Sequence, residues 1–301
     1  MERVSVDNKS NLRGQFFGFL SCLMWGLAFL YNKILIKHFD FISINFYRYV
    51  VGTVALVIIV KLMRINEKIK KKDIMKIVST GVLGMALYNV FTTLSLKYLP
   101  TTICGVFNGA IPILTVFIEY AIIQKKKMPR RLVFIACVSF LGIALVVLGS
   151  NSGSIGSDYK GYLFLILSIF SWIYYTFASK DILDRYNTLI VLKYQIICAM
   201  ILFVIPMAFK GNSVIAEMVL FSKVEIVGSL IGLGVFCSAF AYIFYAKGLL
   251  IIGQSQMSFY TNLMPVISII GGLLVLGETT SIIQMSGVVI VVMSVFFKGG
   301  S

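Results

Sequence analysis

The 301-residue chain is too apolar for a water-soluble protein: 59% of its residues are hydrophobic, 13% are charged and the mean hydropathy is +0.94. Soluble domains carry roughly 45–50% apolar and about 25% charged residues. The composition therefore excludes a soluble domain, a disulfide-rich secreted scaffold and a disordered chain. The net charge of +15 does not indicate nucleic-acid binding, because the basic residues cluster between apolar runs. We expect an integral membrane protein that contacts anionic lipid headgroups and no nucleic acid.

Cysteine and histidine usage gives no sign of a metal centre or a catalytic triad. The cysteines lie within apolar runs and form no CxxC pair, which is typical of small buried residues. His38 is the single histidine, so neither a histidine metal site nor a Ser-His-Asp triad is expected. We expect no cofactor, no metal and no catalytic residue, in a protein that is not an enzyme. The cysteines are Cys22, Cys104, Cys137, Cys198 and Cys237.

Ten apolar segments follow one another along the chain, each near the ~20 residues that span ~30 Å of hydrocarbon as a helix. Continuous apolar runs of this length predict helices, because the strands of a membrane barrel alternate over shorter stretches. The first run is also too long for the core of a signal peptide, so no cleaved leader is expected. The predicted fold class is an all-α polytopic membrane protein with ten transmembrane helices. The segments cover residues 14–36, 41–62, 74–96, 101–123, 131–149, 160–179, 188–209, 223–249, 253–276 and 281–298.

The connectors between these segments are short, and their basic residues predict the topology. Several connectors contain Pro100, Pro129, Gly211 or Gly253. Most of the 27 lysines and arginines fall on one side: before the first segment, within 61–76 and 125–131, and near Arg185 and Lys298. Because positive charge is retained in the cytoplasm, both termini are expected on the cytoplasmic side of the inner cell membrane.

The two halves of the chain resemble one another. A constant offset aligns positions of the first two segments with positions of the sixth and seventh, and a slightly larger offset continues the match. The change of offset falls in a connector, where insertions are tolerated. We interpret the chain as two five-helix units, residues 1–149 and 160–301, joined by a linker at 150–159. The aligned pairs are Gly14 and Gly161, Ser21 and Ser168, Trp25 and Trp172, Lys33 and Lys180, Tyr47 and Tyr194, Gly81 and Gly234, Gly84 and Cys237, Phe91 and Phe244, and Pro112 and Pro265.

A unit with an odd number of helices enters the membrane in the opposite direction when it is repeated. The two units are therefore expected to form an inverted repeat, related by an axis in the membrane plane. The two units of an inverted repeat can adopt two arrangements in which they exchange conformations. A site near the midplane is then open to one side of the membrane in each arrangement. This arrangement favours a carrier.

Four phrases of the sequence are similar to a known family: Trp25-Gly26, Phe46-Tyr47-Arg48-Tyr49, Leu99-Pro100 and Pro265…Leu276-Gly277-Glu278…Gly287. They resemble the EamA family of the drug/metabolite transporter superfamily, as two tandem five-helix units over essentially the whole chain. The resemblance implies the family's fold and a transport role, and it leaves the substrate open. The chain departs from the pattern at Lys125, where the second unit has Glu278, and at Gln195, where the first unit has Arg48.

Equivalent faces of the first and sixth segments carry small polar and aromatic residues. Lipid-facing positions are expected to be aliphatic, so these faces are predicted to contact protein or a cavity. Trp25 and Trp172 lie too deep for an interfacial belt. We interpret both as lining a cavity, with Asn32 and Tyr175 beside them; an aromatic packing seam is the alternative. The first stripe is Ser21, Trp25, Ala28, Phe29 and Asn32, and the second is Ser168, Trp172, Tyr175, Thr176 and Ser179.

The fourth and ninth segments carry a second matched stripe. Pro112 and Pro265 are expected to kink their helices within the membrane. The freed carbonyls, with Asn108 and Asn262, are predicted to contact a polar ligand. Tight helix crossing through small residues is the alternative. The pairs are Thr101 and Gln254, Gly105 and Ser258, Asn108 and Thr261, and Pro112 and Pro265.

The third and eighth segments add phenol and amide groups at a similar depth. These are Tyr88, Asn89 and Tyr242, with lining or packing both open as roles. Together with Trp25, Trp172, Tyr175 and Tyr260, they suit a neutral, zwitterionic or weakly cationic solute with an apolar part. Amino acids and amphipathic metabolites fit this description.

Few charged residues lie within the segments. Arg48 is a functional candidate because a charge inside the membrane is costly, and snorkelling or a structural pair is the alternative. Glu119 lies near the cytoplasmic end of its segment and is expected to be an interfacial or paired carboxylate. Proton-coupled carriers usually hold a titratable group near the midplane. Because Glu119 lies away from the midplane, we predict facilitated diffusion, with any proton coupling weak and dependent on Glu119.

These observations favour a secondary transporter that exports small organic solutes, or facilitates their diffusion, by alternating access. The chain has no G-x-x-x-x-G-K-[ST] phosphate-binding loop, which excludes ATP-driven pumping by this chain. A channel is an alternative, but it needs a continuous polar face or ring. A membrane-embedded enzyme is less favoured, since it needs a constellation of acid, base or metal ligands at membrane depth.

Overall fold

The computed structural model of the chain describes residues 8–98, 108, 110–149, 159–264, 266–267, 270–271 and 281–296. Within these ranges all regular structure is helical, and six helical stretches are long and apolar enough to cross a membrane. Two shorter apolar stretches, Ile111–Ile123 and Ile282–Ser294, also occur. The described part of the chain thus agrees with a polytopic helical membrane protein.

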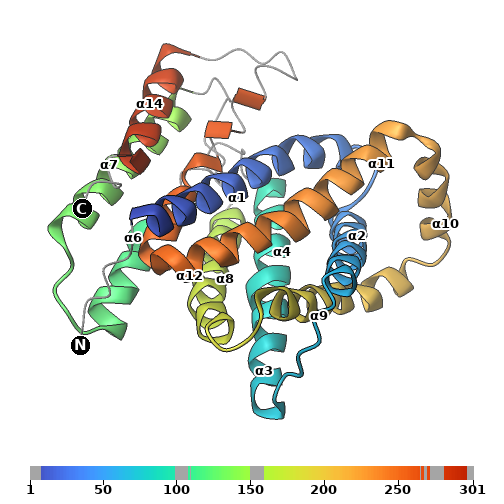
Figure 1. Cartoon of the computed structure of the whole chain (residues 1–301). Helices are drawn as coiled ribbons and strands as arrows, with labels where there is room; N and C mark the ends of the chain where they lie inside the picture. The colour runs from blue at the N-terminus through green and yellow to red at the C-terminus, as the bar shows by residue number, and fades with distance from the viewer. Residues whose placement is uncertain are drawn as a thin grey trace.

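The helices are arranged along the chain as in Figure 1. In the first half they are α1 (Asn8–Leu35), α2 (Phe41–Leu62), α3 (Lys71–Ser79), η1 (Thr80–Ala86), α4 (Leu87–Tyr98), α6 (Ile111–Phe117), η2 (Ile118–Ile123) and α7 (Arg130–Leu148). In the second half they are α8 (Tyr159–Leu183), α9 (Thr188–Phe209), α10 (Asn212–Val219), η3 (Leu220–Ser222), α11 (Val224–Ile231), η4 (Gly232–Phe240), α12 (Ala241–Tyr260) and α14 (Ile282–Phe296).

The second helix of each half begins at an equivalent capping residue. The Asp40 carboxylate accepts a hydrogen bond from the Ser43 N–H at 2.9 Å, at the start of α2. The Asn187 side-chain oxygen accepts one from the Leu189 N–H at 3.0 Å, at the start of α9. Each cap satisfies a backbone donor that the first helical turn leaves free. Both helices have the bounds that the apolar runs predict, 41–62 and 188–209.

Wide π-helical turns interrupt the third helix of each half at matching places. The segment η1 lies between α3 and α4, and η4 lies between α11 and α12. Such turns are rare and are frequent at functional sites, because the extra residue per turn redirects side chains. The sequence pattern did not predict them.

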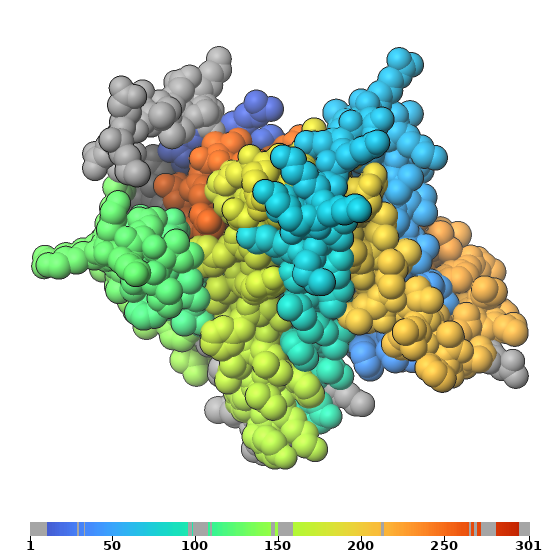
Figure 2. Space-filling view, turned by 90° about the horizontal axis from the view of Figure 1, so that it is seen from below, coloured from blue at the N-terminus to red at the C-terminus, as the bar shows by residue number. Residues whose placement is uncertain are grey.

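Most contacts between the two halves have a counterpart, in which the equivalent helices of the opposite halves meet. Helix α1 packs on α12 and η4, and α8 packs on the equivalent elements α4 and η1. Helix α2 contacts η4, and α9 contacts η1. Two contacts join equivalent helices directly, α2 with α9 and α7 with α14. The last pair lies at the left of Figure 1, and Figure 2 shows α4 beside α8.

Three details of the chain path bear on the sequence prediction. At Gly253 the backbone leaves the helical region, with φ 75° and ψ 175°, at the expected connector. The expected connector after α9 instead contains the short helix α10. The expected kink within the fourth segment also differs: α6 begins at Ile111, so Pro112 lies in its first turn, where its missing N–H removes no helical hydrogen bond.

Candidate functional site

The two tryptophans of the chain meet where the halves join. Trp25 on α1 and Trp172 on α8 have ring centroids 5.1 Å apart and planes at 86°. They are 7% and 3% exposed. Edge-to-face contact of this kind is favourable because the ring edges are positive and the ring faces are negative. Residues matched by the internal repeat are thus in direct contact, as a closely packed pair.

Four tyrosines from α4, α8 and α12 pack around the two tryptophans. Tyr88 lies 4.9 Å from Trp172, and Tyr175 lies 5.3 Å from it, between ring centroids. Tyr242 and Tyr245 lie 5.2 Å from Trp25. Tyr88, Tyr175 and Tyr242 were proposed from the sequence, and the structure adds Tyr245. We call Trp25, Trp172 and these four tyrosines the aromatic cluster.

Polar atoms in the aromatic cluster differ in how well they are satisfied. The Trp25 indole donates to the Cys237 carbonyl at 2.9 Å, and the hydroxyls of Tyr245 and Thr176 are 2.9 Å apart. Among the described residues, the Trp172 indole nitrogen and the Tyr175 hydroxyl are buried and make no close, well-aligned hydrogen bond. Buried polar groups are usually paired, so these two mark positions where a polar ligand is favoured.

Arg48 lies beside the aromatic cluster and is 6% exposed. Its Nε donates to the Ser238 hydroxyl and its Nη1 to the Asn89 side-chain oxygen, each at 2.9 Å. The Asn89 amide in turn donates to the Tyr49 hydroxyl at 2.8 Å. These contacts join α2, α4 and η4. Both sequence candidates, the buried Arg48 and the half-buried Asn89, therefore belong to one hydrogen-bonded polar cluster.

Gln195 takes the equivalent place in the second half. Its amide nitrogen donates to the hydroxyls of Thr80 at 2.8 Å and Ser179 at 3.1 Å. These contacts join α9, η1 and α8, as Arg48 joins the equivalent region of the first half. A neutral amide thus links the helices on one side of the molecule and a guanidinium on the other.

Two matched glycines allow the backbones of the halves to approach closely. A Cβ atom on Gly81 would lie 2.4 Å from the Gln195 carbonyl oxygen. A Cβ on Gly234 would lie 2.5 Å from Val51 Cβ and 3.0 Å from the Arg48 carbonyl oxygen. Real Cβ contacts are longer than this, so only glycine fits at both positions. The weak glycine match in the sequence therefore has a clear structural basis.

Other residues proposed from the sequence have different contacts. The Asn32 amide donates to the Ala28 carbonyl of its own helix at 2.8 Å. The Tyr260 ring packs directly on Gly18 of α1. The Asn262 amide donates to the Ser139 hydroxyl at 2.6 Å. Pro112 and Asn108 are buried, and Pro265 lies outside the described residues.

Glu119 has a structural contact at the kink in α12. Its carboxylate accepts hydrogen bonds from the Ser255 N–H at 2.9 Å and from the Ser255 hydroxyl. The Gln124 amide also donates to it, at 3.2 Å. Ser255 follows the break at Gly253, so Glu119 satisfies a backbone donor at the start of the new helical stretch.

Comparison with known proteins agrees with this architecture. A model of the EamA-like transporter family matches residues 12–148 and 159–298. The chain belongs to this family. The family resemblance expected from the sequence is thereby confirmed, and the two matched ranges are two EamA units.

Relatives of this EamA-like transporter are similar over nearly their whole length. An uncharacterized transporter of Archaeoglobus fulgidus is 25% identical over 278 residues, which cover 92% of this chain and 95% of that protein. The uncharacterized transporter YyaM of Bacillus subtilis is 22% identical over 278 residues, covering 91% and 90%. A solved crystal structure shares the fold, with a TM-score of 0.75 at 16% identity, covering 94% of this chain and 96% of that one.

Two ionic networks of the transporter were not found from the sequence. The α2–α10 network comprises Asp40, Ser43, Tyr47, Lys210 and Glu217. Lys210 lies 2.8 Å from the Asp40 carboxylate and 2.5 Å from the Glu217 carboxylate, which also accepts hydrogen bonds from Ser43 and Tyr47. Partial burial alone would raise the pKa of Asp40, but hydrogen bonds from Lys210 and the Ser43 N–H hold it below its ordinary value.

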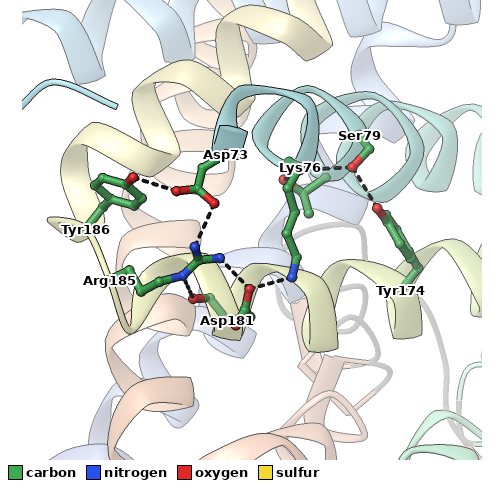
Figure 3. Close-up of polar contacts among 8 residues, drawn as sticks. Asp73, Lys76, Ser79, Tyr174, Asp181, Arg185 and Tyr186 are labelled. Carbon is green, nitrogen blue, oxygen red and sulfur yellow. Dashed lines mark hydrogen bonds and ion pairs between the residues drawn. The ribbon is translucent and has the colours of Figure 1, made fainter. Parts of the chain in front are cut away.

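The α3–α8 network, drawn in Figure 3, comprises Asp73, Lys76, Asp181, Arg185 and Tyr186. Arg185 bridges Asp73 and Asp181 with two contacts of 2.6 Å, and Lys76 lies 2.5 Å from Asp181. The Tyr186 hydroxyl donates to Asp73 at 2.7 Å, which raises the pKa of this phenol. The charges come from both halves, from α3 and from the C-terminal end of α8 and its following turn.

The two networks lie toward opposite ends of α2. Asp40 directly precedes α2, whereas Asp73 lies on the next helix after its end. Helix α2 has 22 residues. At about 1.5 Å per residue, a helix of this length spans the ~30 Å hydrocarbon layer. Each network connects the two halves on a different side of the aromatic cluster. Local charge spacing does not reveal such contacts, because the partners are far apart in sequence.

Proposed function

We propose that this EamA-like transporter moves small organic solutes by alternating access. In this proposal ten helices form an inverted repeat in the cell membrane, with both termini in the cytoplasm. The observation that carries the proposal is the meeting of the repeat-equivalent tryptophans, Trp25 and Trp172, between two halves whose helix contacts exchange in pairs. Two halves that rock about a shared central contact expose it to each side in turn.

The two ionic networks support this mechanism as contacts that break and form during the cycle. With the proposed topology, the α3–α8 network lies at the cytoplasmic face and the α2–α10 network at the opposite face. In the α3–α8 network the Lys76–Asp181 pair is exposed at both ends, and exposed ion pairs are weak, typically about 0–1 kcal/mol each. Contacts of this strength hold the halves together without preventing their separation.

The aromatic cluster supports a solute with an apolar part. Aromatic rings offer apolar area and a negative face, which suit amphipathic metabolites and amino acids with neutral, zwitterionic or weakly cationic groups. Because the rings contact one another in this structure, binding of a solute in this proposal separates the rings.

Transport by purified protein in liposomes tests the proposal. We expect saturable flux of at least one solute in a panel of amino acids and amphipathic metabolites, and accelerated exchange when unlabelled solute is present on the far side. Flux that rises linearly with concentration and shows no exchange would indicate a channel instead. Protein-free liposomes are the control.

The same assay with an imposed pH gradient tests coupling. Glu119 binds the backbone at Ser255, so we propose a structural role for it and expect facilitated diffusion. The gradient is expected to change solute accumulation little, in wild type and in Glu119→Gln alike. Strong uphill accumulation that survives Glu119→Gln would contradict this expectation and point to another coupling group.

A further inference from the structure

We propose, resting on the proposed transport function, that Arg48 binds the carboxylate of the solute. The substrate class is then amphipathic monocarboxylates, including amino acids, with the apolar part against the aromatic cluster. A carboxylate matches the planar fork of the guanidinium, which donates two parallel hydrogen bonds to it.

The first step of the argument is the charge of Arg48. Its partners in the described part of the chain are neutral: the Ser238 hydroxyl, the Asn89 amide oxygen and the Tyr49 ring, whose centroid lies 5.7 Å from Cζ. The two hydrogen bonds use two of the five guanidinium N–H donors. A cation that is 6% exposed and paired with neutral groups favours an anion at the remaining donors.

The second step is the comparison with the matched position. Gln195 links α9 to η1 and α8 with a neutral amide, and it is fully buried. Helix linkage at this place in the fold therefore does not require a charge. The charge of Arg48 is an addition specific to one half, and a substrate with one anionic group needs only one such site.

The third step is the location next to the aromatic cluster. Ser238, which binds Arg48, follows Cys237, whose carbonyl accepts the hydrogen bond from Trp25. Asn89, the other partner, follows Tyr88, whose ring contacts Trp172. Each hydrogen-bond partner of the guanidinium therefore directly follows, in the chain, a residue that contacts one of the two tryptophans.

The fourth step is the pair of unsatisfied donors within the aromatic cluster. The Trp172 indole N–H and the Tyr175 hydroxyl are buried and make no close, well-aligned hydrogen bond in the described residues, although the polar side chains of Tyr245 and Ser179 lie near them. Buried donors without a close partner favour an acceptor, and a carboxylate supplies two oxygens. In this proposal these two donors bind a polar atom of the solute, beside the rings that hold its apolar part.

Tryptophan fluorescence provides a direct measurement, because Trp25 and Trp172 are the two tryptophans of the whole chain. The probes are 3-phenylpropanoate and hexanoate, each compared with its neutral amide, titrated into the purified full-length protein. We expect each acid to change the emission and to bind roughly 10- to 100-fold more tightly than its amide, the range of a hydrogen-bonded charge.

Variants separate the charge from the packing. Arg48→Gln is expected to bind acid and amide about equally, whereas Arg48→Lys keeps part of the preference because it keeps the charge. The matched control Gln195→Met is expected to keep the full preference. Thermal unfolding shows whether each variant is folded, and the acid–amide comparison in wild type does not depend on any variant.

The outcomes distinguish this proposal from the transport proposal. Equal binding of acid and amide by wild type, no binding of either, or a preference that survives Arg48→Gln in folded protein would each overturn the carboxylate proposal. The titration needs no transport, so a clear acid preference without saturable flux would count against transport alone. Saturable flux without acid preference would count against the role of Arg48 alone.

Discussion

Gly81→Ala is expected to destabilise the protein by about 1–3 kcal/mol, the usual cost of overpacking a well-packed interior. The new Cβ would lie 2.4 Å from the Gln195 carbonyl oxygen and 3.0 Å from Cys198 Cβ, so η1 and α9 must move apart. Gly234→Ala is expected to have a similar effect at the matched contact with α2. Thermal unfolding of the purified variants in detergent measures the change.

Gly228→Ala is the matched control for these glycine variants. Gly228 is also helical, in α11, but a Cβ there would meet no atom within 4 Å. Alanine favours helix over glycine by about 1 kcal/mol, so the control is expected to be neutral or stabilising. Equal stability of Gly81→Ala and Gly228→Ala would contradict close backbone packing between the halves.

Trp172→Ala is expected to reduce transport by at least about 10-fold and to destabilise the protein by about 3–5 kcal/mol. The side chain is 3% exposed and contacts Trp25, Tyr88, Tyr175 and Tyr245. Its removal leaves a large cavity and also removes surface proposed for the solute. Flux in liposomes and thermal unfolding are the two measurements.

Two further variants separate binding from packing at this position. Trp172→Phe keeps an aromatic ring and is expected to recover most of the stability. Phe170→Ala on the same helix is the control, because that side chain is 54% exposed and its loss affects packing little. Full transport by folded Trp172→Ala would show that the aromatic cluster has no role in transport.

The internal repeat of the sequence matches Trp25 with Trp172, and the structure brings these two side chains into contact. The match between Trp25 and Trp172 survives in the sequence because both halves use the same side chain at the shared contact. The bounds of α2 and α9 also follow from the sequence, since each apolar run begins directly after a polar cap, Asp40 or Asn187. Gly253 was expected as a connector because glycine adopts positive φ without strain.

The ionic networks and the π-helical turns depend on tertiary contacts, which a local pattern does not contain. Arg185 meets Asp73 across a separation of 112 residues. Helix α10 was expected to be a connector, because its eight residues are too few to span a membrane. The π-turns of η1 and η4 have no distinct composition, and they show only in the hydrogen-bonding of the backbone. Close packing at Gly81 was likewise visible only as a weak glycine match.

A reversible cross-link between α3 and α8 tests the central claim most directly. Lys76 and Asp181 are 2.5 Å apart and come from different halves of the chain. Both are replaced by cysteine in a protein without its five native cysteines, and a short cleavable thiol reagent joins them. Alternating access predicts that the cross-link arrests flux in liposomes and that reductive cleavage restores it, while the single-cysteine variants remain active after the same treatment. Unchanged flux through the fully cross-linked protein would contradict alternating access by separation of the two halves.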